Sequence, residues 1–385
     1  MIEIKEVKNV RDLKKFVHFP LRLYKNNKYY VPPILLDEIN YLQKHKNPAF
    51  ESAEVGLFLA YKSKKIVGRI AGFVLYEYND KINENRVRFS RFDSVDDQTV
   101  ANALFDAVVE FGKKFNATKL HGPLGANDLD REGLLIEGFT TEQTFEEQYN
   151  FEYYVKLIEN YGFKKEVDWL EYRIFLPKKM DERIERISSL VLKRSNLEIA
   201  KIEKKNAFID KYKDGIFNVL DEAYAKLYGV VPISDGVRRE VVKQFKLLLD
   251  PRFICVVLNE KKEVVAFGLA VPSLAKAVQK SNGRLFPFGL FRLLYAVKKP
   301  KNIDLGLIAV KPEYQRTGIN AIVLNEIGKK IINAGIPYVE TNLQLESNVE
   351  VQAQFENFEK IQHKKRRSYA MDIKHCNIKQ KNTTF

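Results

Sequence analysis

The sequence predicts an α/β fold made of two similar halves, each with a mixed and partly parallel sheet. The chain has 385 residues, more than the ~250–300 at which a single hydrophobic core normally stops growing. The same order of elements (a strand pair, a strand, a helix, a strand, a helix and a strand) occurs twice, about 200 residues apart. Because strands alternate with helices long enough to cross a sheet, we expect some neighbouring strands to be parallel.

The first half alternates short apolar strands with amphipathic helices. Residues 55–62 and 65–76 have the pattern of two strands joined by a tight polar turn at Ser63 and Lys64. Segment 98–115 places apolar residues at helical spacing and predicts the main helix of this half. The other expected elements are a strand at 2–7, helices at 10–16 and 35–44, strands at 86–95 and 118–125, a loop at 126–139, a helix at 153–162 and a strand at 170–176.

The second half repeats this order after a polar, charged stretch at 177–189, which we interpret as a linker or bridging helix. We therefore predict two domains, residues 1–178 and 179–385. The expected elements of the second half are helices at 206–228 and 235–249, strands at 253–259, 263–273 and 303–310, a helix at 320–335, a strand at 338–343, a helix near 349–358 and a strand at 366–373.

Charge and cysteine content limit the classes of function. The formal net charge of +14 favours an anionic partner such as nucleic acid, a membrane surface or a polyphosphate cofactor, although a solvated basic surface explains it equally well. Cys255 and Cys376 are far apart and the histidines lack metal-binding spacing, so neither a disulfide nor a metal site is expected. The N-terminus has no signal-peptide core, and no uncharged run reaches the ~20 residues that span a bilayer, which predicts a cytoplasmic protein.

One segment of the second half has the pattern of an anion-binding loop. An apolar strand ends at Val310, Pro312 interrupts the strand ladder, and a long helix begins just after Gly318. Such a connection directs several backbone N–H groups and the positive end of the helix dipole toward one point. Gly318 permits close approach of an anion, and Arg316 supplies a mobile cation. The sequence therefore predicts a diphosphate ligand here.

This segment resembles the coenzyme A (CoA) motif of the GCN5-related N-acetyltransferases (GNATs), in the pattern Val310-x-Pro312-x-Tyr314-Gln315-x-x-Gly318. The resemblance implies tandem GNAT-like domains, the second of which binds acetyl-CoA or another acyl-CoA as donor. In the family the strand lines the pantetheine arm and the loop holds the diphosphate. The residues implied are Leu307, Ile308, Ala309, Val310, Gln315, Arg316, Thr317, Gly318, Ile319 and Asn320. Asn320 stands where the family has Gly or Ala, and we expect this departure to affect affinity.

Residues after the next strand complete the implied site. The family often has an Asn after this strand and an aromatic residue on the next helix, both near the CoA sulfur; Asn348 and Phe355 match these positions. Phe355 lacks the hydroxyl of the family's general acid. Glu346 and Glu340 are candidate bases for the acceptor ammonium, which must lose a proton before it attacks the thioester. Either is alternatively a solvated side chain or a helix cap, our preferred interpretation for Glu340. We assign catalysis to Glu346 and Asn348.

The first half shows a complementary pattern. The helix and turn around Tyr154, Gly162 and Phe163 resemble the end of a GNAT domain, but the counterpart of the phosphate loop, 93–98, contains three carboxylates and no glycine. Because carboxylates repel a diphosphate, we predict a degenerate domain that does not bind CoA. A polar group after residue 120 either lines an acceptor pocket between the halves or forms an ordinary surface loop. Its members are His121, Asn127, Asp130, Arg131 and Glu137.

Three functions stay open. The favoured one is an N-acyltransferase of the acetyltransferase type, in which an unidentified amine attacks acyl-CoA directly. The second is a long-chain N-acyltransferase that makes an acylated amino acid or lipid at the membrane surface, suggested by the apolar and basic segment 283–301. For that segment a buried inter-domain insertion is our preferred interpretation. The third is a non-catalytic CoA-sensing or CoA-binding module. Nucleic acid is not expected, because the basic residues lack the interleaved aromatics of a single-strand binder.

Overall fold

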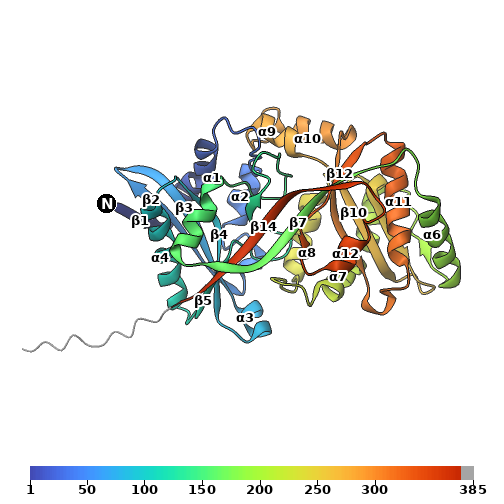
Figure 1. Ribbon diagram of the computed structural model, residues 1–385, viewed down its shortest axis with the longest axis horizontal. Helices are drawn as coiled ribbons and strands as arrows, with labels where there is room; N and C mark the ends of the chain where they lie inside the picture. The colour runs from blue at the N-terminus through green and yellow to red at the C-terminus, as the bar shows by residue number, and fades with distance from the viewer. Residues whose placement is uncertain (374–385) are drawn as a thin grey trace, which may run out of the picture.

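The structure, a computed structural model, describes residues 1–373 of the chain. These residues form one continuous 14-stranded mixed sheet with helices on both faces (Figure 1). The strand order is β1-β2-β3-β4-β5-β14-β7-β12-β11-β10-β9-β8, with β6 beside β14 and β13 beside β7. The strands are β1 (Ile2–Glu6), β2 (Ala53–Lys62), β3 (Lys65–Leu75), β4 (Arg86–Ser94), β5 (Lys119–Gly122), β6 (Leu134–Glu137), β7 (Lys164–Phe175), β8 (Glu198–Ile199), β9 (Ile254–Leu258), β10 (Val264–Pro272), β11 (Ile303–Val310), β12 (Tyr338–Glu340), β13 (Gln344–Leu345) and β14 (Lys360–Asp372). The mixed α/β architecture predicted from the sequence is confirmed.

Helices cover both faces because alternate strand residues are apolar on both sides. Phe58 of β2 packs toward the core under α4, whereas its neighbour Leu57 packs toward α1 and α2. In the second half Val257 faces the core under α11, and Val256 faces α7 and α8. The helices are α1 (Val10–Leu23), α2 (Leu35–Tyr41), α3 (Tyr76–Ile82), α4 (Gln98–Lys113), α5 (Tyr153–Tyr161), α6 (Glu182–Arg194), α7 (Lys205–Tyr224), α8 (Asp235–Phe245), α9 (Ala275–Ser281), α10 (Gly289–Lys298), α11 (Ile319–Asn333) and α12 (Val349–Ala353), with short 3-10 turns at Pro48–Phe50, Pro251–Phe253 and Pro312–Tyr314.

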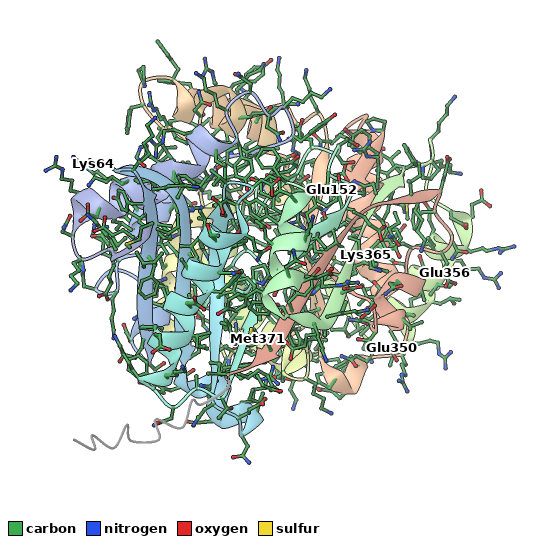
Figure 2. The ribbon with its side chains drawn as sticks, turned by 60° about the vertical axis from the view of Figure 1, so that its left-hand side comes forward. Lys64, Glu152, Glu350, Glu356, Lys365 and Met371 are labelled. Carbon is green, nitrogen blue, oxygen red and sulfur yellow. The ribbon has the colours of Figure 1, made fainter. Side chains whose placement is uncertain are left out.

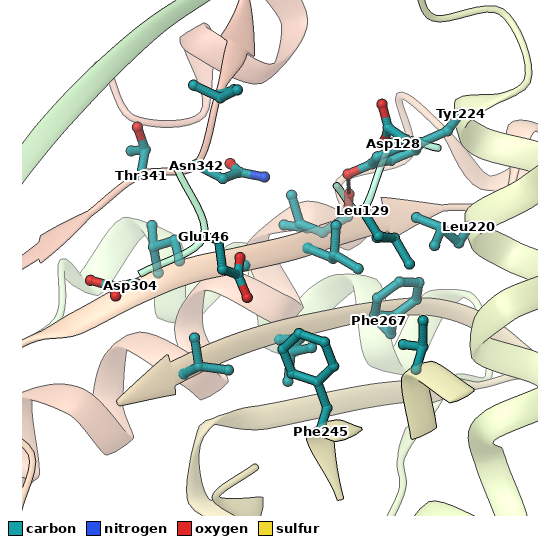
Figure 3. Close-up of a pocket in the computed structure, with 18 of the residues that line it drawn as sticks. Asp128, Leu129, Glu146, Leu220, Tyr224, Phe245, Phe267, Asp304, Thr341 and Asn342 are labelled. Atoms are coloured by element: carbon teal, nitrogen blue, oxygen red, sulfur yellow. Dashed lines mark hydrogen bonds between the residues drawn. The ribbon is translucent and has the colours of Figure 1, made fainter. Parts of the chain in front are cut away.

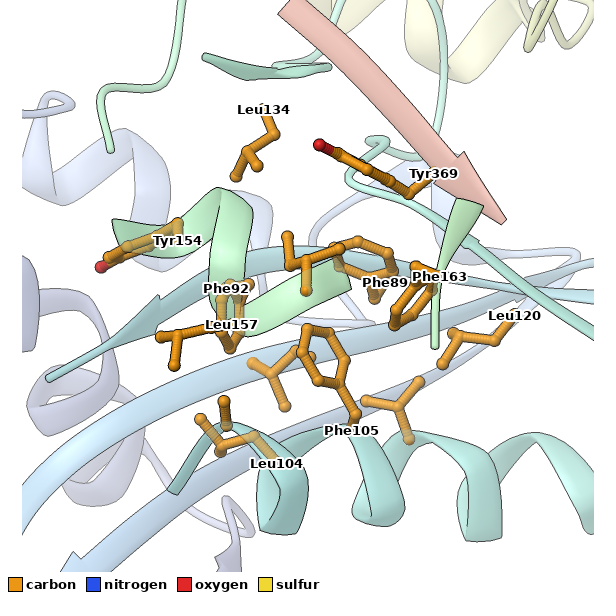
Figure 4. Close-up of a cluster of buried hydrophobic side chains, with 14 of the residues drawn as sticks. Phe89, Phe92, Leu104, Phe105, Leu120, Leu134, Tyr154, Leu157, Phe163 and Tyr369 are labelled. Carbon is orange, nitrogen blue, oxygen red and sulfur yellow. The ribbon is translucent and has the colours of Figure 1, made fainter. Parts of the chain in front are cut away.

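The strand order is the same when read from either edge toward the centre. Strands β1 to β5 correspond in place to β8 to β12, and two exchanged strands lie between them. The last strand of the chain, β14, pairs with β5 of the first half, whereas β7 pairs with β12 of the second half. Tyr369 of β14 accordingly packs with Phe89 and Phe105 in the core of the first half (Figure 4). The domain boundary between residues 178 and 179 stays a prediction.

A buried ion network fixes the two exchanged strands against each other. Arg366 Nε of β14 donates to Glu171 Oε1 of β7 at 2.7 Å, and its Nη2 donates to Glu147 Oε2 at 3.0 Å. Lys364 Nζ binds the same two carboxylates, Glu147 at 2.7 Å and Glu171 at 2.5 Å. Removing one member of such a network leaves an uncompensated buried charge, at a cost of about 3–5 kcal/mol. Strand β14, on which Figure 2 labels Lys365 and Met371, crosses the middle of the molecule.

Several elements are longer than predicted because of tertiary contacts. Helix α1 continues past Pro20, which has no N–H for the carbonyl of Phe16; Arg69 Nη1 donates to that carbonyl instead, at 3.0 Å. Strands β7 and β14 begin at Lys164 and Lys360, earlier than expected, because they pair with each other along most of their length. Neither effect is visible in the local sequence.

Segment 283–301 differs from its preferred interpretation. It contains helix α10, which lies at the upper edge of the molecule in Figure 1. The side chains of Phe286, Phe288 and Phe291 are 74%, 64% and 70% exposed. The interpretation as a buried inter-domain insertion is therefore wrong.

Candidate active site

The second half of the sheet opens between two parallel strands. Strands β11 and β12 pair at Ile303 with Val339 and at Asp304 with Glu340, and no further pairing between them follows in the described residues. The remainder of β11, from Leu305 to Val310, keeps β10 as its sheet neighbour. Backbone groups on the open side of β11 are thus available to a ligand that enters between the two strands.

A bulge changes the backbone of β11 at this opening. Gly268 pairs with Ile308 and Ala270 pairs with Leu305, so three steps along β11 match two along β10. The extra residue lies at Gly306 or Leu307, and a bulge of this kind re-aims backbone N–H and C=O groups. The hydroxyl of Tyr224, at the end of α7, donates to the Ile308 carbonyl at 3.2 Å.

The loop after β11 leads to an uncapped helix terminus. Gly318 is the N-cap of α11 with a φ of 89°, and it has no side chain with which to cap the helix. A Cβ at this position would lie 3.0 Å from Val191 Cγ2 of α6, so the backbone lies close to that helix. Gln315, Arg316 and Thr317 are exposed, which leaves the outer side of the loop open. An uncapped terminus with this exposure is suited to an anion.

Hydrogen bonds hold the loop in shape. Gln315 Nε2 donates to the Val310 carbonyl at 3.1 Å, and Thr317 Oγ1 donates to the Tyr314 carbonyl at 2.6 Å. Arg316 has a φ of 61° and its guanidinium binds Glu350 Oε1 at 2.7 Å, with the side chain 84% exposed. Such an exposed pair contributes little free energy, so Arg316 can exchange Glu350 for an anionic ligand.

Two cavities meet at the opening between β11 and β12. The smaller, of about 70 Å³, lies on the α11 side and includes Phe355 and Val323. The larger, of about 300 Å³, lies on the α7 and α8 side. Residues 305–308 of β11, together with Thr341 and Asn342, line both. The two cavities therefore share one wall at the opening in the sheet.

The larger cavity is mainly apolar. Helices α7 and α8 form one wall, and strands β9, β10 and β11 form another. Figure 3 labels Leu220, Phe245 and Phe267 among the apolar side chains that line this cavity. The apolar residues that line the larger cavity include Phe208, Phe217, Leu220, Val242, Phe245 and Phe267. Loops of the first half, including residues 128–130, Glu132 and residues 144–147, close the remaining side.

The whole arrangement has a solved counterpart. The tandem GNAT protein from the clavulanic acid biosynthesis pathway superposes with a TM-score of 0.54 at 10% identity, covering 97% of this chain and 99% of that chain. The chain has the GNAT fold. The predicted resemblance is thereby confirmed for the fold, including its tandem arrangement.

Two curated proteins align with this GNAT-fold chain over most of its length. Protein YghO of Escherichia coli (strain K12) is 26% identical over 380 residues, which cover 95% of this chain and 94% of the relative. The bacterial ceramide synthase of Caulobacter vibrioides is 26% identical over 321 residues, 80% of each chain. No protein-family model matches the chain.

Acidic side chains interrupt the apolar cavity. Burial raises the pKa of Asp128 to about 6, against the opposing charges of Arg88 and Lys81. Glu146 projects into the cavity (Figure 3), and the surrounding protein together with the charge of Glu147 raises its pKa to about 7. Burial also raises the pKa of Asp304 well above its usual value. No ion pair to Asp128, Glu146 or Asp304 is found within residues 1–373.

Asp128 lies near the bulged strand. Its charge raises the pKa of Tyr224, after the larger effect of burial, and Tyr224 contacts Ile308. Asp304 instead occupies the last paired position before β11 and β12 separate. A strand advances about 3.3 Å per residue, so Asp304 is well removed from Ile308. Asp128 is therefore a candidate to act on a group held beside Ile308.

The predicted catalytic residues occupy different surroundings. Asn348 lines the larger cavity, and its side chain also caps α12 by accepting from Val351 N at 3.3 Å. Glu346 binds Lys165 Nζ at 2.8 Å and accepts from Asp168 N at 3.2 Å, and it does not line either cavity. Phe355 is 7% exposed and lines the smaller cavity. The catalytic role of Glu346 stays a prediction, and the structure does not bring it to the opening.

Glu340 is neither solvated nor a helix cap. It lies in β12, 6% exposed, and binds Arg173 Nη2 and His363 Nε2, each at 2.7 Å. The preferred interpretation of Glu340 is therefore wrong. Its partner Arg173 lies on the exchanged strand β7, 167 residues earlier in the chain, so this ion pair cannot be inferred from the spacing of residues in the sequence.

The structure places the members of the polar group after β5 in different surroundings. Asp130 lines the larger cavity but is held by Arg91 at 2.6 Å and 2.8 Å. His121 is buried beside Tyr228, and Asn127 accepts from Leu129 N at 3.0 Å. His121, Asn127, Arg131 and Glu137 do not line the cavity. Asp128, directly beside the predicted Asn127, was missed because an acid in a polar loop carries no local sign of burial.

Some classes of site receive no support from the described residues. No group of three or more His, Cys, Asp or Glu side chains within residues 1–373 is arranged to hold a metal ion. Within the same range, no helix combines the length and the hydropathy required to cross a bilayer. The GNAT fold and its two cavities are thus the features that bear on function.

Proposed function

We propose that the protein is an acyl-CoA-dependent N-acyltransferase whose donor carries a long acyl chain. The main observation in support is that the apolar cavity of about 300 Å³ is lined in part by the same β11 residues that border the opening. A two-carbon acetyl group would leave most of such a cavity unfilled, whereas burying a methylene group contributes about 0.8 kcal/mol. The volume also lies at the lower end of the ~300–1,000 Å³ typical of ligand pockets.

The residues present fit coenzyme A on the α11 face. The diphosphate would lie at Gly318, where the backbone turns with a φ of 89° and no side chain occupies the helix terminus. Arg316 would turn from Glu350 to the phosphates. Leu307 to Val310 would bind the pantetheine arm through backbone groups that β12 leaves unpaired. Gln315, Thr317, Ile319 and Asn320 would shape the loop, and Phe355 would lie beside the arm.

The acyl carbonyl would then lie at the bulge of β11. A backbone N–H at Gly306 to Ile308 would stabilise the negative charge that forms on the thioester oxygen. Asp128, with a pKa raised to about 6 by burial, would take the proton of the acceptor ammonium. The amine nitrogen then forms the C–N bond and loses a second proton, the C–S bond breaks, and the sulfur takes up that proton and leaves as the thiol of CoA. Tyr224 would hold the strand carbonyl and orient the reacting groups.

A relative with a lipid product supports the long chain. The protein from Caulobacter vibrioides is named a bacterial ceramide synthase, and it aligns over 80% of this chain. A ceramide contains a long-chain acyl group joined to an amine through an amide bond. The apolar cavity and its acidic side chains match that combination, an alkyl chain and an ammonium, and favour an amine acceptor.

Binding of acyl-CoAs of increasing length tests the proposal. Thermal unfolding would be followed with CoA, acetyl-CoA, octanoyl-CoA and palmitoyl-CoA at concentrations below micelle formation. A ligand at 100 times its Kd stabilises the folded protein by about 2.7 kcal/mol. We expect stabilisation to increase with chain length, and release of free CoA when a long-chain amine is added.

A matched pair of variants locates the chain. Val242→Trp places an indole in the cavity and should weaken palmitoyl-CoA binding about tenfold or more while acetyl-CoA binding is unchanged. Val109→Trp, also on a partly buried helix position but remote from the cavity, is the control. Equal stabilisation by acetyl-CoA and palmitoyl-CoA would contradict the long-chain donor, and no stabilisation by any of them would contradict the transferase itself.

A further inference from the structure

Helix α10 and the segment that joins it to α9 present an apolar surface that nothing in the described chain covers. Phe286, Phe288 and Phe291 lie within six residues, and within residues 1–373 they are the phenylalanines with exposed side chains. Tyr295, on the same helix, is 63% exposed. Protein cores bury most of this type of side chain, and a clustered exposed patch indicates an interaction site.

The charge around this patch has one sign. Between residues 275 and 301 the sequence contains seven Lys and Arg residues and no Asp or Glu. Lys298 and Lys299 follow the aromatic side chains at the end of α10, and Lys299 Nζ lies 5.9 Å from the centre of the Tyr295 ring. Exposed aromatics bordered by Lys and Arg are typical of segments that lie in the headgroup region of an anionic bilayer.

The patch is rigidly attached to the body of the protein. The buried side of α10 packs through Leu293 against α9 and the segment that contains Val31 and Ile34. Leu35 N donates to the Gly283 carbonyl at 2.9 Å, and Gln279 Nε2 donates to the Tyr30 carbonyl at 3.0 Å. The aromatic side chains are therefore held outward by a fixed platform.

The platform also contacts the wall of the larger cavity. Leu248, Leu274 and Phe145 pack in the same core as α9 and α10, and all three line that cavity. The core that holds α10 in place thus also forms part of the cavity wall. A bilayer in contact with the patch would lie directly outside the proposed acyl-chain site.

We propose that residues 283–299 dock the protein on the surface of an anionic lipid bilayer. Phe286, Phe288 and Phe291 enter the headgroup region, and the flanking Lys and Arg side chains contact anionic headgroups. Docking there places the cavity next to lipid-borne amines and acyl chains. That last consequence rests on the proposed function, whereas the docking itself rests on the surface alone.

Sedimentation of the full-length protein with lipid vesicles tests the docking. Vesicles of phosphatidylcholine alone are compared with vesicles of phosphatidylcholine and phosphatidylglycerol in equal amounts. We expect binding to the mixed vesicles, weakened by salt because screening shortens the range of the charges. Lys298→Glu together with Lys299→Glu should weaken this binding by about fivefold or more for each charge. Wild-type protein that stays in the supernatant with mixed vesicles at low salt would overturn the proposal.

Variants of the aromatic residues identify the contact. The triple variant Phe286→Ser, Phe288→Ser, Phe291→Ser should lose binding about tenfold or more, whereas Val10→Ser with Ile361→Ser, at exposed apolar positions elsewhere, should bind like the wild type. Triple-variant binding equal to wild type would overturn the proposal. So would a wild-type dimer that depends on these phenylalanines, since the partner would then be a second copy.

A fluorescence signal that appears only on insertion tests the docking in a way that a folding defect cannot imitate. The protein has one Trp, Trp169, which is 3% exposed. In Phe288→Trp the new indole should shift its emission to the blue when mixed vesicles are added, and an unchanged spectrum would contradict insertion. Acyl-CoA stabilisation measured without vesicles separates the two proposals: its absence removes the proposed function, while vesicle binding still supports the surface.

Discussion

The two halves of the sheet each have an opening of the same backbone geometry, but the opening is filled by side chains in the first half and occupied by cavities in the second. In both, a bulged strand separates from a parallel neighbour: β4 pairs with β5 at Arg86 to Arg88, and three steps along β4, from Ser90 to Asp93, match two along β3. In the first half, side chains of the chain itself fill the opening. Ser94 N donates to the Tyr154 hydroxyl at 3.0 Å, and the Tyr153 hydroxyl donates to the Ser94 carbonyl at 2.7 Å. In the second half cavities occupy the same place.

The helix termini beside the two openings differ in the same way. Asp97 caps α4, where its carboxylate accepts from Thr99 N at 3.0 Å and binds Lys62 at 2.9 Å. Gly318 leaves α11 without a side-chain cap. One carboxylate in the first half thus takes the place that an anionic ligand would take in the second. The comparison teaches that a duplicated fold keeps or loses a ligand through the side chains at two points, while its backbone stays the same.

The largest expected effect is on the reaction itself. Asp128→Asn should lower kcat/KM about 10²- to 10⁴-fold, because a neutral amide cannot accept the proton of the acceptor ammonium. The wild-type rate should rise with pH through about 6, where the half-buried Asp128 carboxyl ionises, and this step should be absent in the variant. Asp96→Asn, in the loop of the first half that corresponds to the CoA loop, should leave the rate unchanged. A pH step retained in Asp128→Asn would assign the base to another residue.

Donor binding should depend on one glycine. Gly318→Glu introduces a carboxylate where the diphosphate is proposed to bind and should weaken CoA binding about 10- to 100-fold, measured by calorimetry. Gly335→Glu is the control, since Gly335 has a similar φ of 71° at the other end of the same helix and open space around it. Equal losses in both variants would mean that backbone strain, and not the ligand, explains the effect.

A pair of tyrosines should separate stability from activity. Tyr154→Phe leaves the buried Ser94 N–H without its acceptor and should lower the free energy of unfolding by about 1–3 kcal/mol, with donor binding intact. Tyr224→Phe faces a cavity, where water can replace the lost contact, so it should cost less stability but lower activity about tenfold. Urea unfolding and CoA release measure the two quantities. If Tyr154→Phe reduced donor binding, the filled first half would have a role in the site.

The smallest expected effect is at the cap of α4. Asp97→Ala should lower the free energy of unfolding by about 1 kcal/mol, as is typical of a lost N-cap, without changing donor binding. Hydrogen bonds from Lys62 and Thr99 lower the pKa of Asp97 to about 2. A carboxyl with a lowered pKa stabilises the fold at pH values above its unfolded pKa, and the contribution fades as the pH falls toward about 2. Equal unfolding free energies of the variant and wild type at pH 7 would contradict the capping role.

Local patterns were sufficient for most elements and for one part of the site. The alternation of strands and amphipathic helices predicted the α/β class, and β11 has the predicted bounds, Ile303–Val310. The Gly318 loop was visible because a strand, a glycine and a helix follow one another within the chain. The burial of segment 283–301, which contains Phe286 and Phe291, was predicted wrongly, since an apolar residue in a sequence does not show which side of a helix is covered.

Long-range contacts decided the remainder. The exchange of β7 and β14, the burial of Glu340 against Arg173, and the cavity between α7 and β11 all join residues far apart in the chain. The sequence by itself determined which segments become strands and helices, because periodicity and turn chemistry act over a few residues. Only the tertiary structure decided which opening is filled and which acid is buried, because burial depends on every element that packs around a side chain.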